Sequence, residues 1–309
     1  MRVKCWVVGR GLFLLLLVFL AGCSVLTPSQ VKEVKRFAFA AQDFGYIPGS
    51  VINSYAELRT RERIYSAAGF IPGPNVLPQI ESALKARREY QNQAEQSEKA
   101  MAILNQYAQL LAVLTSDDFS EDLQEEAENL GKRIDKGIGT FNQESGKEIK
   151  AFGGVFAGSI RGVGGLYIKR RQTIVLQEAV SKADPMIEEM TIAVNGLLDL
   201  YLPGTAGDGF IRETESSLKK VFEANIQGAM AKEPLFVAMK LAETLEFSEN
   251  TYRLAVQTKQ SIANLRHAHR ELMSNLQKKR KIKGTIEMVK VFADEVKDAN
   301  NLKKKLEKE

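Results

Sequence analysis

Apolar residues recur at every third or fourth position along most of the chain, a spacing that gathers them on one face of an α-helix. Between residues 78 and 114 this face carries Met101, Leu104, Ala108, Leu111 and Leu114. A further stripe after residues 116–118 carries Leu123, Leu130, Ile134, Ile138, Phe141 and Phe152. No stretch has the alternation of a convincing strand. The pattern predicts an all-α fold, a bundle of long antiparallel helices with several helical hairpins.

Proline and glycine indicate where these helices end. The eight prolines leave residues 79–184, and everything after Pro234, without an interruption. Both segments are rich in residues that lose little rotamer freedom in a helix, so we expect long helices there. The expected breaks between helices are Pro48-Gly49, residues 71–74 and residues 203–209.

The same residues suggest how the chain is divided. Asp184 followed by Pro185 is typical of a cap and a first helical position, so we expect a helix to begin there. The loop at 203–209 separates an N-terminal helical region, 31–202, from a C-terminal long-helix region, 210–309. We expect the two regions to pack together as one bundle.

A glycine-rich segment at residues 151–168 reads AFGGVFAGSIRGVGGLYI. Gly154, Gly158 and Gly162 are four apart, so on a helix they would share one face and let another backbone approach closely. As a helix the segment would be roughly 27 Å long, close to a bilayer's hydrocarbon core. Arg161 near its middle would cost roughly 2.5 to 3.5 kcal/mol at the bilayer centre. We favour a packing or hairpin role, with membrane contact as the alternative.

The layout of this segment between long amphipathic helices resembles that of helical-bundle pore-forming toxins, although no motif of those toxins matches. The resemblance implies an alternative function for the chain. It would be a membrane-active or pore-forming helical assembly that uses residues 151–168 after a conformational change.

The first 23 residues combine three features in a fixed order. A cationic start with Arg2, Lys4 and Arg10 precedes an apolar core at 12–20, and the core ends in Leu20-Ala21-Gly22-Cys23. This order resembles that of bacterial lipoprotein precursors, whose signal peptide ends in such a box. The apolar run is short against the roughly 20 residues of a membrane-spanning helix, which favours cleavage over a retained helix.

The resemblance to lipoproteins implies a signal peptide at 1–22, a diacylglyceryl thioether with fatty acids such as palmitate on Cys23, and a short tether over 23–30. It also implies export and membrane anchoring. Ser24, where lipoproteins of the inner membrane usually carry aspartate, favours the periplasmic face of the outer membrane if the host has two membranes.

Removing the signal peptide changes the charge and the cysteine count. Arg2, Lys4 and Arg10 leave without an acidic residue, so the formal net charge falls from +5 to +2. The basic character of the whole chain is then mostly a targeting signal, and we expect no nucleic-acid partner. Cys5 leaves and Cys23 is acylated, which excludes a disulfide, a cysteine-based zinc site and a cysteine nucleophile.

Cations cluster near the C-terminus, at Lys278, Lys279, Arg280, Lys281 and Lys283. They could bind anionic lipid headgroups. A solvated helix end whose cations complement the helix dipole is the simpler interpretation.

The sequence carries none of the common catalytic or metal-binding patterns. His267 and His269 are the only histidines, and two positions apart on a helix they point in nearly opposite directions. The HExxH, GxSxG and P-loop patterns are absent, and the acidic pairs Asp117-Asp118 and Glu125-Glu126 have no partner pattern for acid–base chemistry. We therefore expect no enzyme activity, no cofactor and no metal.

The resulting hypothesis is a lipid-anchored extracytoplasmic helical protein that acts by binding, as an envelope scaffold, adaptor or assembly factor. Its partners would be the membrane, through Cys23, and a further protein or a second copy of the chain.

Overall fold

The computed structural model describes residues 25–70, 76–117, 121–146, 148–156, 165–203, 208–229, 234–278 and 283–308. Within these ranges the chain forms helices and no strand, which confirms the predicted all-α bundle. Cys23, Gly158, Gly162, Arg161, Lys279, Arg280 and Lys281 lie outside the described residues, as does the side chain of Lys278.

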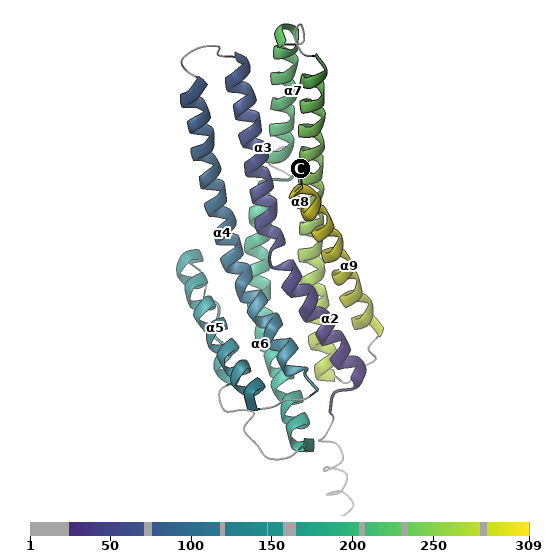
Figure 1. Cartoon of the computed structure of the whole chain (residues 1–309). Helices are drawn as coiled ribbons and strands as arrows, with labels where there is room; N and C mark the ends of the chain where they lie inside the picture. The colour runs from purple at the N-terminus through teal and green to yellow at the C-terminus, as the bar shows by residue number, and fades with distance from the viewer. Residues whose placement is uncertain are drawn as a thin grey trace, which may run out of the picture.

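The first half of the bundle pairs two short helices with one long helix (Figure 1). Helices α2 (Pro28–Phe44) and α3 (Ile47–Phe70) run one after the other in the same direction, and α4 (Val76–Leu114) returns antiparallel along both. Helix α5 (Glu121–Ser145) packs on α4, and the 3-10 turn η1 (Gly153–Phe156) packs on α5.

The second half repeats this plan. Helices α6 (Gly165–Leu198) and α7 (Gly209–Ala229) run in one direction, and α8 (Pro234–Lys278) returns along both. The 45 residues of α8 make it about 68 Å long. The last helix, α9 (Lys283–Leu306), lies beside α8 and also contacts α2, which joins the two halves.

Two aromatic clusters lie where the halves meet, and the first of them is fully buried. Phe37 and Phe44 of α2 pack against Phe292 of α9, with ring centroids 5.8 and 6.1 Å apart. Closer to the α3–α4 and α7–α8 connections, Tyr55 contacts Tyr90, Tyr201 and Phe210. All residues of the described core lie between Val34 and Leu306, so the mature chain expected from the sequence contains the whole of it.

One end of the bundle, which we call the base, is held by side chains that join four helices. Gln30 of α2 donates to Asn275 Oδ1 of α8 at 3.1 Å, and Gln177 of α6 donates to the Leu276 carbonyl at 2.7 Å. Gln172 of α6 donates to the Leu114 carbonyl, where α4 ends, at 2.7 Å. The N-terminal end of the described chain is therefore fixed at the base.

Two predicted breaks are wrong. Pro48 and Gly49 lie in the first turn of α3, where proline is tolerated, and the interruption falls at Gly45-Tyr46 instead. Pro185 does not start a helix either, because α6 continues through it to Leu198. Asp184 is therefore not a cap, and its carboxylate is free to bond another helix.

The stripe predicted to extend to Phe152 is also shorter than expected. Helix α5 ends at Ser145, and Gly146 follows with φ +68°, a left-handed conformation that glycine adopts at helix C-termini. The chain then turns back, and the Asn142 side chain bonds both the N–H and the carbonyl of Ile149, at 3.0 and 2.8 Å. Phe152 reaches the core from outside the helix and packs 6.4 Å from the Tyr107 ring.

No helix in the described ranges combines the length and the apolar character needed to cross a membrane.

Candidate functional site

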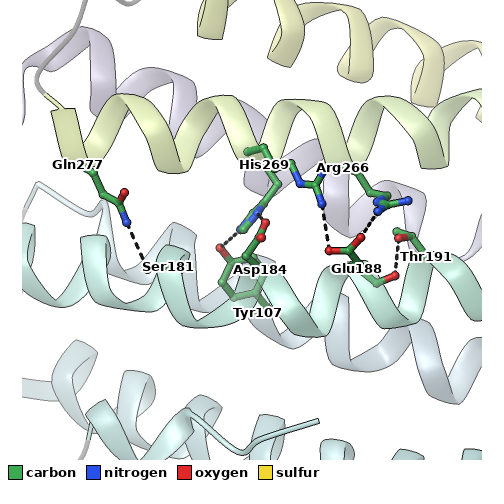
Figure 2. Close-up of polar contacts among 9 residues, drawn as sticks. Tyr107, Ser181, Asp184, Glu188, Thr191, Arg266, His269 and Gln277 are labelled. Carbon is green, nitrogen blue, oxygen red and sulfur yellow. Dashed lines mark hydrogen bonds and ion pairs between the residues drawn. The ribbon is translucent and has the colours of Figure 1, made fainter. Parts of the chain in front are cut away.

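Figure 2 shows a line of polar contacts between α6 and α8. At its centre His269 is completely buried. Its Nδ1 lies 3.1 Å from Asp184 Oδ1 on α6, and its Nε2 lies 3.0 Å from the Tyr107 hydroxyl on α4. The three side chains come from three helices, so their contact fixes how α4, α6 and α8 sit against one another.

The pKa shifts of the three groups agree on one protonation pattern. Burial lowers the pKa of His269 below its usual 6.5, although Asp184 opposes the shift. The hydrogen bond from His269 lowers the pKa of Asp184, and burial raises the pKa of Tyr107 well above its usual value. A neutral His269 therefore donates from Nδ1 to the Asp184 carboxylate and accepts the Tyr107 O–H at Nε2.

Ion pairs continue this line of polar contacts along α6 and α8. Glu188 accepts hydrogen bonds from Arg266 and, at 3.0 Å, from Arg270. In the other direction Gln277 donates to the Ser181 hydroxyl at 3.2 Å. These groups are partly exposed, so each pair contributes little free energy alone. Together they specify one register of α8 on α6.

Asp184, His269 and Tyr107 are arranged in the order of a catalytic triad, but a substrate cannot reach the histidine or the tyrosine. A general base must come within hydrogen-bond reach of a substrate, and both Tyr107 and His269 are fully buried. None of the three residues lines the surface groove between α2 and α9, the groove between α4, α5 and α6, or the groove at the base. The geometry thus gives the triad a structural role.

Acidification is expected to weaken the fold through His269. Because its pKa is lowered in the folded state, the unfolded chain binds a proton that the folded chain does not. The stability contributed by this group is complete above about pH 6.5 and falls as the pH drops below that value. Urea unfolding between about pH 7.5 and about pH 5 measures this slope.

A matched pair of variants tests the assignment. His267→Gln changes an exposed histidine on the same helix and should leave the slope unchanged. His269→Gln should flatten it. Equal slopes in the two variants would show that His269 is not the titrating group.

The described start of the glycine-rich segment is held by a carboxylate. Asp135 of α5 accepts the backbone N–H groups of Phe152, Gly153 and Gly154 at 2.9, 2.6 and 3.1 Å. Gly154, a predicted packing glycine, lies in a 3-10 turn, and a Cβ there would meet no atom within 4 Å. Gly153 is the glycine that needs its small size, since a Cβ would lie 1.9 Å from the Gly131 carbonyl oxygen.

The surface offers an open groove between α2 and α9, which we call the α2–α9 groove, with a volume of about 620 Å³. Phe39, Ala40, Ala293 and Val296 supply its apolar part, and Phe39 is 59% exposed. Its charged residues are Lys32, Lys35, Arg36, Lys297 and Lys304, with Asp43 as the acidic one. Arg36 pairs with the buried Glu33 at 3.2 Å, and the lysine amines keep the groove positive.

Two other grooves differ from it. A larger one of about 790 Å³ lies between α4, α5 and α6, and it combines Lys99, Arg133 and Lys136 with Glu144. A smaller one of about 420 Å³ lies at the base and includes Val25, Lys35 and Lys169. In the described ranges, no three His, Cys, Asp or Glu side chains are grouped as metal ligands.

No family model, curated protein or solved structure matches this chain. Of the candidate packing, membrane-contact and lysine-cluster residues, the structure describes Gly154, Lys283 and the backbone of Lys278, and Gly154 and Lys283 lie on different elements. Of the two histidines, His267 is exposed, whereas His269 contacts Asp184, the residue predicted to be a helix cap. The Asp184–His269–Tyr107 contact was not predicted from the sequence. Its one visible signal was a histidine at an apolar position of a long amphipathic helix.

Proposed function

We propose that this chain is a lipid-anchored extracytoplasmic helical protein that acts by binding, as a scaffold, adaptor or assembly factor of a bacterial envelope. The observation that carries the binding role is the α2–α9 groove. In this groove an apolar floor, an exposed aromatic ring and several lysines come together. The lipoprotein-like N-terminus supports the anchor.

The occupant that fits this groove is an acidic amphipathic helix of a protein partner. Such helices lay an apolar face into a groove between two helices and place charged residues at its rim. Lys297 and Lys304 are seven apart, two turns along α9, so they offer a row of amines to carboxylates of the same spacing. Phe39 provides an aromatic anchor of the kind that dominates interface energies.

Crosslinking in cells tests the binding role. A photoreactive amino acid at Phe39 should trap a discrete protein, and the crosslink should be lost when Lys297→Glu and Lys304→Glu reverse the rim charge. The control position is Ile192, an exposed apolar residue of α6 outside the groove. The same crosslink from both positions, or one that survives charge reversal, would overturn the groove as the binding surface.

The anchor is tested separately. Cells supplied with an alkyne-tagged palmitate should label the wild-type chain and leave Cys23→Ser unlabelled. Labelling that persists in Cys23→Ser would place the lipid elsewhere, and an unlabelled wild type would remove the anchor from the proposal.

A further inference from the structure

The end of the chain that would carry the lipid is already held against the bundle. Val25 is two residues after Cys23, so at most about 7 Å of chain separates their Cα atoms. Leu26 donates its N–H to Thr173 Oγ1 of α6 at 3.4 Å, and Thr27 caps α2 through a reciprocal pair of hydrogen bonds with Gln30. Acyl chains on Cys23 would therefore bring the base of the bundle to the bilayer surface.

The small groove at the base lies at this point, and we call it the basal groove. Its volume is about 420 Å³, within the range of small-ligand sites. The apolar part of its lining consists of Val25, Leu26, Pro28, Val31 and Leu114. Gln172 joins its walls, because its side-chain amide donates to the carbonyls of Leu114 and Ser116 at 2.7 and 2.9 Å. These two hydrogen bonds hold α6 against the C-terminal end of α4 beside the groove.

Three lysines from two helices line the basal groove: Lys32 and Lys35 of α2, and Lys169 of α6. Lys35 lies 3.6 Å from Asp117, the acidic residue of the lining. Lys32 and Lys169 are exposed and have no ion pair among the described residues. Two amines without a counter-charge beside an apolar surface match a phosphate group attached to a glycerol and its acyl chains.

We propose that the basal groove binds the phosphate headgroup of an anionic phospholipid in the membrane that holds the anchor. The inference rests on the proposed lipid anchor, because the anchor is what brings this groove to the bilayer. Lys32 and Lys169 bind the phosphate, and the apolar lining contacts the glycerol and upper acyl carbons. The bundle then contacts the membrane at two places, through the acyl chains on Cys23 and through the basal groove. The basal groove selects the lipid.

The test uses the unacylated mature chain, residues 23–309 with Cys23→Ser, and flotation with vesicles. We expect binding to phosphatidylcholine vesicles that contain phosphatidylglycerol and much weaker binding to pure phosphatidylcholine. Lys32→Gln with Lys169→Gln should weaken binding about 25-fold, as about fivefold per lysine predicts. The matched control, Lys85→Gln with Lys220→Gln, removes the same charge from exposed positions outside the described grooves and should change binding less than about twofold.

Soluble competitors separate the possible ligands. Glycerol 1-phosphate should displace the protein from the vesicles at concentrations where inorganic phosphate does not. Equal competition by inorganic phosphate would identify a free-phosphate site, and no competition by either would show attraction to surface charge alone. Equal losses in the two double variants would also overturn the proposal.

Failure of the anchor is distinguishable from failure of the headgroup site. Palmitate labelling in cells reports only on Cys23, whereas flotation of the unacylated chain reports only on the groove. Labelling without lysine-dependent flotation would keep the anchor and remove the headgroup site. Lysine-dependent flotation without labelling would do the reverse.

Discussion

Replacing Gly153 with alanine is expected to lower the free energy of unfolding by about 3 kcal/mol, whereas the same change at Gly154 should alter it by less than about 0.5 kcal/mol. The new Cβ at 153 would lie 1.9 Å from the carbonyl oxygen and 2.4 Å from the carbonyl carbon of Gly131. Both are backbone atoms and cannot rotate away. The turn η1 would have to move off α5 and lose hydrogen bonds to Asp135.

Urea unfolding measures the global effect, and hydrogen exchange of residues 148–156 measures the local one. Gly154→Ala is the matched control, because the same side chain is added one residue away in open space. Equal stability and equal exchange in the two variants would mean that η1 does not pack on α5 as described. The pair also shows whether the glycines of this segment serve packing within the bundle.

The second large effect is expected at the buried triad. His269→Leu removes the acceptor of the Tyr107 hydroxyl, which is wholly buried, and should lower the free energy of unfolding by about 2 to 3 kcal/mol. Asp184 loses a partner too, but its side chain is 25% exposed and water can replace the bond. The main cost is therefore the hydroxyl left without a partner in the core.

A double variant tests that cause. Adding Tyr107→Phe to His269→Leu removes the orphaned hydroxyl and should restore about 1 to 2 kcal/mol, although Tyr107→Phe is itself destabilising in the wild-type background. Thermal or urea unfolding of the four proteins gives the coupling energy. Strictly additive effects would show that Tyr107 and His269 do not form the buried hydrogen bond.

Much of the helical layout could be predicted from local pattern. The helix predicted from Pro78 to Leu114 begins at Val76 and ends at Leu114. The proline-free stretch after Pro234, where long helices were predicted, forms α8 and α9. Such agreement is expected, since a helix of this length depends mainly on its own apolar face and on the absence of helix breakers.

The breaks at single residues were harder to predict. Asp184-Pro185 has the sequence of a helix start, yet α6 passes through it. The cost of an internal proline is about 3 kcal/mol. The buried face of α6 at Val180, Ala183, Met186 and Ile187, together with the bond from Asp184 to His269, outweighs this cost. A short stretch of sequence does not show that the residues on both sides of a proline are buried.

The candidate binding surfaces were even harder to predict from the sequence. Lys32 and Lys169 are 137 positions apart in the sequence, and they line one groove because α2 and α6 meet at the base. The lysine-rich run at 278–283 is recognisable in the sequence because its residues are adjacent in the chain. Lysines that come together from different helices form no such pattern in the sequence.

The sequence by itself determined that this protein is all-helical and where its long helices run, and its N-terminal motif is the basis of the proposed lipid anchor. These are local properties, set by periodicity, helix breakers and a contiguous motif. Only the tertiary structure decided that Asp184, His269 and Tyr107 form one buried contact, that Gly153 rather than Gly154 must be glycine, and which lysines share a groove. Such features depend on which helix faces meet and in what register, because a hydrogen bond, a close backbone approach or a shared charge requires atoms from distant segments to come together.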